Sequence, residues 1–461
     1  MIFNRFGRIV VFAAVPCLLA GSIFGYRAVS IGTAYKAKIL CSGVWVSKRD
    51  PQAVMDAELA VDDLGVLRLI RSRIDHDAKL VSASLFGIAT RTAVFRQGQG
   101  CALALSDPAQ VPRERSPLAG LSSRPEMRQA ATFAEPSSSD LHLQRLGAIV
   151  DGAFMEDDPN RLRRTRAVLI VHRGRLVAER YAPGFSRDTP LPGWSMAKSV
   201  MNALVGILVK QGKIALHDPV PVAQWHSSGD PRRAITMEHL LHMSSGLQFD
   251  ESYRNPLSDV MVMLLASPDA AAIAIARPLA SDPGTQWHYS SGTTNIIARV
   301  IRNIVGDQQY PDFPRQALFE RIGMSSATME TDSMGTFVGS SFMYATTRDW
   351  ARLGMLYQQD GMWNGERILP EGWVAYSRTP APHSPGGQYG AHFWLRYPPE
   401  LQCKEKSPPF PDDAFHAIGH EGQHLTVVPS RELVIVRLGL TRQPCNWDHH
   451  AFVGAILRAL D

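Results

Sequence analysis

Trp194-Ser195-Met196-Ala197-Lys198 places a hydroxyl and an amine three residues apart at the start of a helical segment. The residues from Ser195 to Gln211 are mostly apolar, contain no proline and are followed by Gly212, which predicts a helix with a glycine at its C-terminal end. Residues three apart share a face of a helix, so the two side chains should meet. A serine becomes nucleophilic when a neighbouring base takes its proton, and a lysine whose pKa is lowered by burial can do so. Ser195 and Lys198 are therefore the candidate nucleophile and base.

A tyrosine motif further along the chain adds support, which is needed because a spacing of three also fits a helix-capping serine and a solvated lysine. Tyr289-Ser290-Ser291 follows the turn-forming Asp282-Pro283-Gly284 and precedes an apolar helical run from Thr294 to Val305. Tyr289 is thus expected on a loop that enters a helix. A nearby lysine ammonium should lower the pKa of its phenol, which would then serve as a partner base and later as the acid for the leaving group.

The third motif, Gly419-His420-Glu421-Gly422-Gln423, stands directly before Leu425 to Val428, a run that predicts a strand whose backbone lines a substrate cleft. With His424 it also spells H-E-x-x-H, the zinc-peptidase signature, so a zinc peptidase using His420 and His424 is an alternative. That chemistry requires a helix, whereas two glycines and a following strand disfavour one here. On a strand the two histidines would stand roughly 13 Å apart, so no metal is expected.

In this order, the three motifs resemble those of the serine β-lactamase and penicillin-binding-protein superfamily. Ser195-Met196-Ala197-Lys198 matches the first motif, and Tyr289-Ser290-Ser291 matches the second with serine where β-lactamases usually have asparagine. His420-Glu421-Gly422 occupies the place of Lys-Thr-Gly, as in many esterase-like members. The likeness covers roughly Arg164 to Asp461 and is strongest for the class C-like branch of esterases, D-amino-acid peptidases and 6-aminohexanoate-oligomer hydrolases.

The resemblance implies acyl transfer without a cofactor. Ser195 would attack an ester or amide carbonyl, with Lys198 and Tyr289 as general base and acid, and water would release the acyl-enzyme. The oxyanion hole would be formed by the backbone N–H groups of Ser195 and Gln423. The substrate-binding residues would be His420, Gly422, Ser291 and Trp287.

The departures from the family motifs bear on the substrate. The lysine of Lys-Thr-Gly ordinarily helps to bind the carboxylate of penicillins, and His420 stands in its place, so neutral esters or linear amides are expected ahead of β-lactams. A low-turnover penicillin-binding or cell-wall-fragment-binding protein of the same fold is the alternative. Acidic residues Asp250 and Glu251 are best interpreted as part of a solvated loop, although they offer an amine-binding alternative.

Strands are predicted at both ends of the catalytic part, residues 141–461. One hairpin covers 167–181 with a turn at Arg173-Gly174, and a second covers 425–438 and is followed by a helix from His450 to Leu460. The residues between are mainly helical. This order predicts an α/β, β-lactamase-like fold with an antiparallel sheet flanked by helices and an all-helical subdomain.

The N-terminal region is expected to contain a targeting segment. Residues 9–26 are uncharged and follow Arg5 and Arg8, which fits either a signal peptide or a membrane anchor within residues 1–30. The basic N-terminal flank predicts export of the rest of the chain, to the periplasm or another extracytoplasmic space, with anchoring in the cytoplasmic membrane.

Two further segments precede the catalytic part. Residues 31–105 are predicted to form a small α+β module, with strand-like pieces at 44–46, 80–88 and 93–95 and a helical piece near 53–64. Residues 106–140 are rich in Pro, Ser, Arg and Ala, which predicts a linker.

The cysteines and the charge limit the remaining possibilities. Cys41, Cys101, Cys403 and Cys445 form an even set that allows three connectivities, and pairing Cys41 with Cys101 and Cys403 with Cys445 keeps each bridge local. Four buried free thiols are the alternative. The net charge of +5 comes from scattered basic residues rather than a patch, which argues against a nucleic-acid partner.

Overall fold

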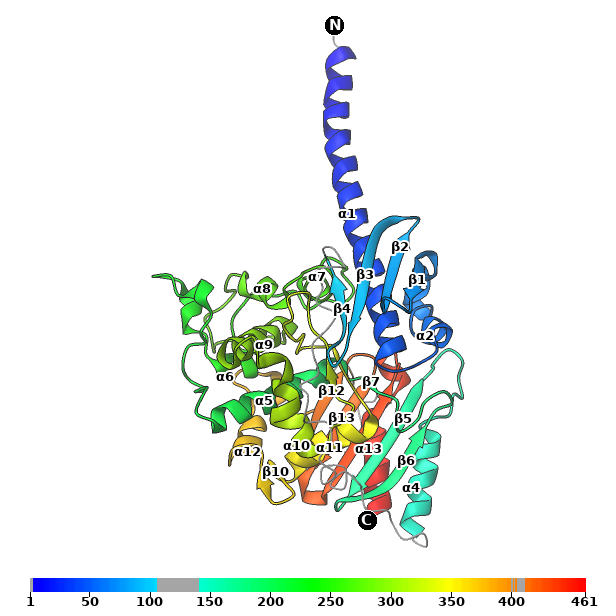
Figure 1. The fold of residues 1–461 in the computed structure, drawn as a ribbon, viewed down its shortest axis with the longest axis vertical. Helices are drawn as coiled ribbons and strands as arrows, with labels where there is room; N and C mark the ends of the chain where they lie inside the picture. Colours follow the sequence, from blue (N-terminus) through cyan, green and yellow to red (C-terminus); the bar gives the residue numbers. More distant parts are fainter. Residues whose placement is uncertain (1–2, 106–140, 399–400, 402, 404–410) are drawn as a thin grey trace.

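The computed structural model describes residues 3–105, 141–398, 401, 403 and 411–461 (Figure 1). The predicted linker at 106–140 lies outside the described residues. Within them the catalytic part is built on a five-stranded antiparallel sheet in the order β12-β13-β14-β5-β6. The strands are β5 (Thr165–His172), β6 (Arg175–Tyr181), β12 (Phe415–Gly419), β13 (Gln423–Val428) and β14 (Leu433–Gly439).

The two chain ends of the catalytic part meet in this sheet, because β14 pairs with β5 in antiparallel register. Both predicted hairpins are present, and β12 is an additional edge strand. Helices α4 (Leu141–Gly152) and α13 (His449–Leu460) cover one face through side chains such as Leu146 and Ile456. Helix α11 (Thr347–Gln358) packs against the other face (Figure 1).

A mainly helical region, inserted between β6 and β12, carries two of the three sequence motifs. It includes α5 (Ala197–Lys210) and α9 (Ser291–Val305), which are buried over most of their length. Smaller elements complete the region: α6 (Met237–Leu241), α7 (Asp259–Leu265), α8 (Ala270–Ile275), α10 (Glu320–Ile322), α12 (Trp373–Ser377), β10 (Met362–Trp363) and β11 (Glu366–Arg367). A three-stranded sheet lies beside α5 and consists of β7 (Leu191–Pro192), β9 (Met343–Ala345) and β8 (Thr328–Met329).

The N-terminal region forms one long helix, α1 (Phe3–Trp45), against a four-stranded antiparallel sheet (Figure 1). The sheet contains β1 (Arg71–Asp75), β2 (Leu80–Leu85), β3 (Ile88–Arg96) and β4 (Gly100–Ala104), with α2 (Pro51–Glu58) and the 3₁₀ helix η1 (Asp62–Leu69) before it. The strand expected at 44–46 is wrong, since Val44 and Trp45 end α1 and pack as helical residues.

The N-terminal module shares its core with the catalytic part. Buried side chains of α1, β2 and β4 belong to the same apolar cluster as those of α5 and α9. A buried ion pair between Lys38 and Glu330 crosses the boundary, and Ser42 Oγ donates to the same carboxylate at 2.8 Å. The module is therefore docked on the catalytic part rather than separate from it.

Cys41 of α1 and Cys101 of β4 form a disulfide with a Cα–Cα distance of 6.1 Å. The second expected bridge is absent, because Cys403 and Cys445 are both thiols in this structure. Instead, the side chains of these two residues are hydrogen-bonded to each other, and the Cys403 sulfur lies 3.6 Å from the Leu401 carbonyl oxygen.

Either a signal peptide or a membrane anchor was expected from the uncharged residues 9–26. Across the described residues, no helix combines the length and the apolar character needed to cross a membrane.

Candidate active site

The first motif forms the start of α5. The 3₁₀ turn η3 (Trp194–Met196) runs directly into the helix, and Lys198 Nζ lies 3.0 Å from Ser195 Oγ. Lys198 also donates to Ser291 Oγ and to the carbonyl oxygen of Ser340, each at 3.0 Å. The amine is therefore held against the Ser195 hydroxyl by fixed partners on two other segments.

Burial sets the chemistry of this amine. The side chain of Lys198 is 1% exposed, and burial lowers its pKa to about 8, against the opposing effect of the Glu251 carboxylate. An appreciable fraction of Lys198 is therefore neutral near pH 8 and can accept a proton. Ser195 itself is only partly buried, which leaves its hydroxyl accessible from the cavity described below.

Tyr289 lies on the loop before α9, as the sequence predicts. Ser290 caps that helix, accepting a hydrogen bond from the backbone N–H of Gly292 at 3.1 Å, and this fixes the loop. The Tyr289 phenol is hydrogen-bonded to Ser195, and Lys198 Nζ lies 4.9 Å from the centre of its ring. Ser195 is thus hydrogen-bonded to both Lys198 and Tyr289.

The expected lowering of the Tyr289 pKa is wrong. Burial, together with the negative charge of Glu251, raises the pKa of the phenol above its usual range. The Tyr289 phenol is accordingly neutral at physiological pH. Of the two partners of Ser195, Lys198 is the one whose proton-accepting form is populated near pH 8.

The third motif is a hairpin turn between β12 and β13. Gly419 pairs with Gln423, and the turn has left-handed backbone at Glu421 (φ 62°) and Gly422 (φ 79°). A zinc site of the H-E-x-x-H type needs a helix, so this structure contradicts the zinc alternative. His420 lies on the turn, while His424 is buried in β13 and lies 3.2 Å from the Tyr397 hydroxyl through Nε2.

The turn lies against the chain that enters α5. A Cβ at Gly419 would come within 2.1 Å of the Gly193 carbonyl oxygen, so only glycine permits this approach. The Gln423 side chain is occupied within the hairpin, where Nε2 donates to the Gly439 carbonyl at 2.9 Å and to that of His420 at 3.2 Å. Any contact of Gln423 with substrate is therefore left to its backbone.

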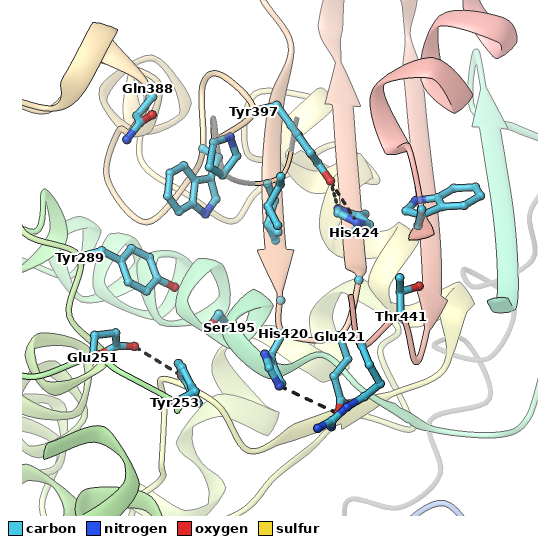
Figure 2. A pocket seen from close by; sticks show the side chains of 18 of the residues that line it. Ser195, Glu251, Tyr253, Tyr289, Gln388, Tyr397, His420, Glu421, His424 and Thr441 are labelled. Atoms are coloured by element: carbon cyan, nitrogen blue, oxygen red, sulfur yellow. Dashed lines mark hydrogen bonds and ion pairs between the residues drawn. The ribbon is translucent and has the colours of Figure 1, made fainter. Parts of the chain in front are cut away.

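A cavity of about 640 Å³ opens over Ser195 (Figure 2). Tyr289 and His420 lie on either side of Ser195 in this view, with Glu251 and Tyr253 beside them. Of the residues predicted to bind substrate, Trp287, His420 and Gly422 line the cavity. The prediction for Ser291 is wrong. It is the first residue of α9 and is fully buried, accepting from Lys198 and donating to Glu251 Oε1 at 2.6 Å.

Glu251 and Tyr253 line the cavity, which the sequence did not predict. Glu251, assigned to a solvated loop, lines the cavity and accepts from the Ser291 backbone N–H at 2.8 Å. Tyr253 stacks on His420 with ring centres 5.2 Å apart, and Trp394 stacks on Tyr289 at 5.6 Å. The aromatic composition of these loops is the only sequence signal for their presence, and it does not distinguish a cavity wall from a packed interior.

Comparison with known proteins agrees with this arrangement. The family profile described as β-lactamase matches residues 153–445, which contain all three motifs. The chain belongs to the β-lactamase family. It is accordingly a hydrolase of the serine β-lactamase fold, in agreement with the resemblance to the class C-like branch.

Individual β-lactamase-family relatives cover most of the chain. A 6-aminohexanoate-dimer hydrolase of Paenarthrobacter ureafaciens is 26% identical over 361 residues, covering 72% of this chain and 87% of its own length. Among solved structures, a family VIII carboxylesterase superposes with a TM-score of 0.53 at 15% identity, covering 70% of this chain and 99% of that one. A penicillin-binding protein homologue from Caulobacter crescentus gives a TM-score of 0.52 at 16% identity, covering 71% of this chain and 99% of that one. At these identities the two structures show a shared fold.

Proposed function

We propose that this protein hydrolyses a carboxylic ester or linear amide through an acyl-enzyme on Ser195. The observation that carries the proposal is the 3.0 Å contact between Ser195 Oγ and Lys198 Nζ, combined with the lowered pKa of that amine. A buried lysine with this pKa is a general base at mildly alkaline pH, and a solvated lysine is not.

The steps follow from the positions of the three groups. Ser195 Oγ attacks the substrate carbonyl carbon while neutral Lys198 accepts its proton. Tyr289, protonated and hydrogen-bonded to Ser195, donates a proton to the leaving group as the tetrahedral intermediate collapses. Water then attacks the acyl-enzyme, and the same groups remove its proton and return one to Ser195.

The negative charge on the tetrahedral intermediate is stabilised in an oxyanion hole made by the backbone N–H groups of Ser195 and Gln423. The close approach of Gly419 to the Gly193 carbonyl supports this assignment, because it brings the start of β13 beside the start of α5. Removal of one such donor typically lowers kcat by a factor on the order of 10² to 10³.

The cavity and the relatives favour neutral esters or linear amides. The walls contain Trp287, Tyr289 and Trp394, and the lysine of Lys-Thr-Gly is replaced by His420. The name of the Paenarthrobacter relative denotes an amide substrate, and that of the carboxylesterase structure denotes esters.

The test combines active-site labelling with a substrate panel. A fluorophosphonate probe should label Ser195, identified by peptide mass spectrometry, and should fail on Ser195→Ala. Ser186→Ala, at an exposed loop serine, is the control and should label normally. Hydrolysis of p-nitrophenyl acetate or a linear amide retained in Ser195→Ala would overturn the proposal. Stoichiometric acylation by a cephalosporin without ester or amide turnover would show the low-turnover binding protein instead.

Export to an oxidising compartment is part of the proposal. The Cys41–Cys101 disulfide supports it, since such bonds persist mainly outside the reducing cytoplasm. Alkaline phosphatase fused after Asp461 should be active in a bacterial host if the chain is exported. An inactive fusion accompanied by an active β-galactosidase fusion at the same position would contradict export.

A further inference from the structure

A second cavity of about 700 Å³ lies between the N-terminal module and the catalytic part. Its module side is formed by Ile31 of α1 and by Leu64 and Leu67 of η1, and its other side by Met261 and Leu264 of α7. Figure 1 shows α7 next to the point where α1 enters the body of the molecule. Both walls are apolar, and neither part of the chain forms the cavity alone.

This cavity borders the catalytic one. Tyr253, His420 and Arg442 line both, so the stacked rings of Tyr253 and His420 stand at the junction (Figure 2). Trp194, the residue before Ser195, forms part of the wall and contacts His420 edge-on with ring centres 5.6 Å apart. The second cavity therefore adjoins both the catalytic cavity and the segment that carries Ser195.

The lining indicates the class of ligand. Arg442 forms an ion pair with Glu421, so its charge is balanced at the junction. Arg254 and Gln443 are polar and lie at the exposed edge, and the Tyr35 hydroxyl is hydrogen-bonded to Arg442. The other lining side chains are aliphatic or aromatic. Pockets of this size usually bind small molecules, and apolar walls favour hydrocarbon over polar groups.

We propose that the second cavity binds a long aliphatic chain of the substrate, so that the N-terminal module determines chain-length specificity. This inference rests on the proposed function, because the carbonyl joined to that chain is the one that Ser195 attacks. The occupant is a single unbranched hydrocarbon chain, which enters past the Tyr253–His420 stack while the ester or amide group stays in the catalytic cavity.

The experiment measures kcat/KM for p-nitrophenyl esters from acetyl to dodecanoyl. In the wild-type protein kcat/KM should rise with chain length, by up to about fourfold per methylene while the chain fills the cavity. Leu64→Trp and Met261→Trp fill the cavity from opposite walls at partly buried positions, so each should lower the ratio of dodecanoyl to acetyl activity by tenfold or more.

Leu69→Trp is the matched control. It makes the same exchange on the same 3₁₀ helix at a position that is 59% exposed and outside the cavity lining, and it should leave the ratio unchanged. A cooperative thermal unfolding transition shows that a variant is folded. If either Leu64→Trp or Met261→Trp does not fold, the other variant still tests the inference.

Two results would overturn the inference: a wild-type profile that does not rise beyond butanoyl, or an unchanged ratio in folded Leu64→Trp and Met261→Trp. Either result leaves acetyl ester hydrolysis by Ser195 intact. If the proposed function fails instead, the acetyl ester is not cleaved, or Ser195→Ala cleaves it equally well, so the two failures are distinguishable.

Discussion

The indole Nε1 of Trp194 donates a hydrogen bond to Glu421 Oε2 at 3.1 Å, which joins the segment before the nucleophile to the turn of the third motif. Both residues have left-handed backbone, with φ of 48° and 62°. Such conformations are costly for residues other than glycine and persist where surrounding contacts enforce them. The hydrogen bond therefore holds two strained turns in fixed register around Ser195.

Trp194→Phe tests this relationship. The change keeps an aromatic ring but leaves a buried carboxylate with one donor fewer, so the free energy of unfolding should fall by about 1.5–3 kcal/mol. Because the turn also carries the proposed oxyanion donor, kcat should fall more than KM rises. Urea unfolding and steady-state kinetics check the two effects. If Trp194→Phe is less stable but its kcat is unchanged, the Trp194–Glu421 hydrogen bond contributes to stability and not to catalysis.

The pH dependence of kcat/KM should follow Lys198. Burial lowers its pKa to about 8, and the neutral amine is the reactive form. Activity should therefore fall about tenfold per pH unit below about pH 8 and level off above it. Measurement from pH 5.5 to 10 on a neutral ester checks this. A profile that is flat across pH 6–9 would contradict the assignment of Lys198 as the base.

Glu251→Gln should shift that profile to lower pH. The Glu251 carboxylate raises the pKa of Lys198, so its removal leaves burial less opposed and lowers the pKa further. The glutamine oxygen can still accept from Ser291. Asp250→Asn, at the neighbouring exposed carboxylate, should leave the midpoint unchanged. A shift to higher pH in Glu251→Gln, or equal shifts in both variants, would refute this interpretation.

Tyr289→Phe should lower the acylation rate by a factor on the order of 10² to 10⁴ while changing substrate affinity little. The phenol is neutral and hydrogen-bonded to Ser195, so it acts mainly when a proton moves in the transition state. Stopped-flow acylation with an activated ester separates rate from affinity. Equal losses in both quantities would assign the phenol to substrate binding alone.

The sequence predicts the parts of the site that depend on local periodicity. Ser195 and Lys198 meet because a helix brings residues three apart together, and Tyr289 lies on a loop because a turn precedes it and a helix follows. The strands of both terminal hairpins also follow from local pattern. In each case the neighbours that determine the conformation are within a few residues.

The errors concern contacts made at long range. Ser291 was assigned to the cavity, but the packing of α9 against α5 turns it to the buried side of Lys198. Glu251 looked like a loop carboxylate because its partner Ser291 is 40 positions away. Residues 44–46 were assigned to a strand, whereas packing of α1 on the module sheet keeps Val44 and Trp45 helical. The second cavity exists only because the module docks, which no local pattern shows.

Acid should destabilise the fold through buried neutral histidines. Burial lowers the pKa of His416 and of His392 to about 3 and that of His242 to about 4. It also lowers the pKa of His424 and of His449, whose rings are stacked, well below the usual value. Unfolding restores each to about 6.5, so between about pH 6.5 and 3 the unfolded chain binds more protons and stability rises with pH. Each histidine should therefore contribute up to about 1.4 kcal/mol of lost stability per pH unit on acidification through this window, and none above about pH 7.5.

Urea unfolding at pH 7.5, 6.0 and 5.0 measures this slope. The His416 ring lies 2.9 Å from Thr426 Oγ1, and in His416→Gln an amide that does not titrate takes its place. The stability of this variant should therefore depend less steeply on pH than that of the wild type. The exposed His217 is the control, and His217→Gln should leave the slope near that of the wild type because its ring is 78% exposed. A wild-type stability that is constant from pH 7.5 to 5.0 would show that these histidines do not carry the acid sensitivity.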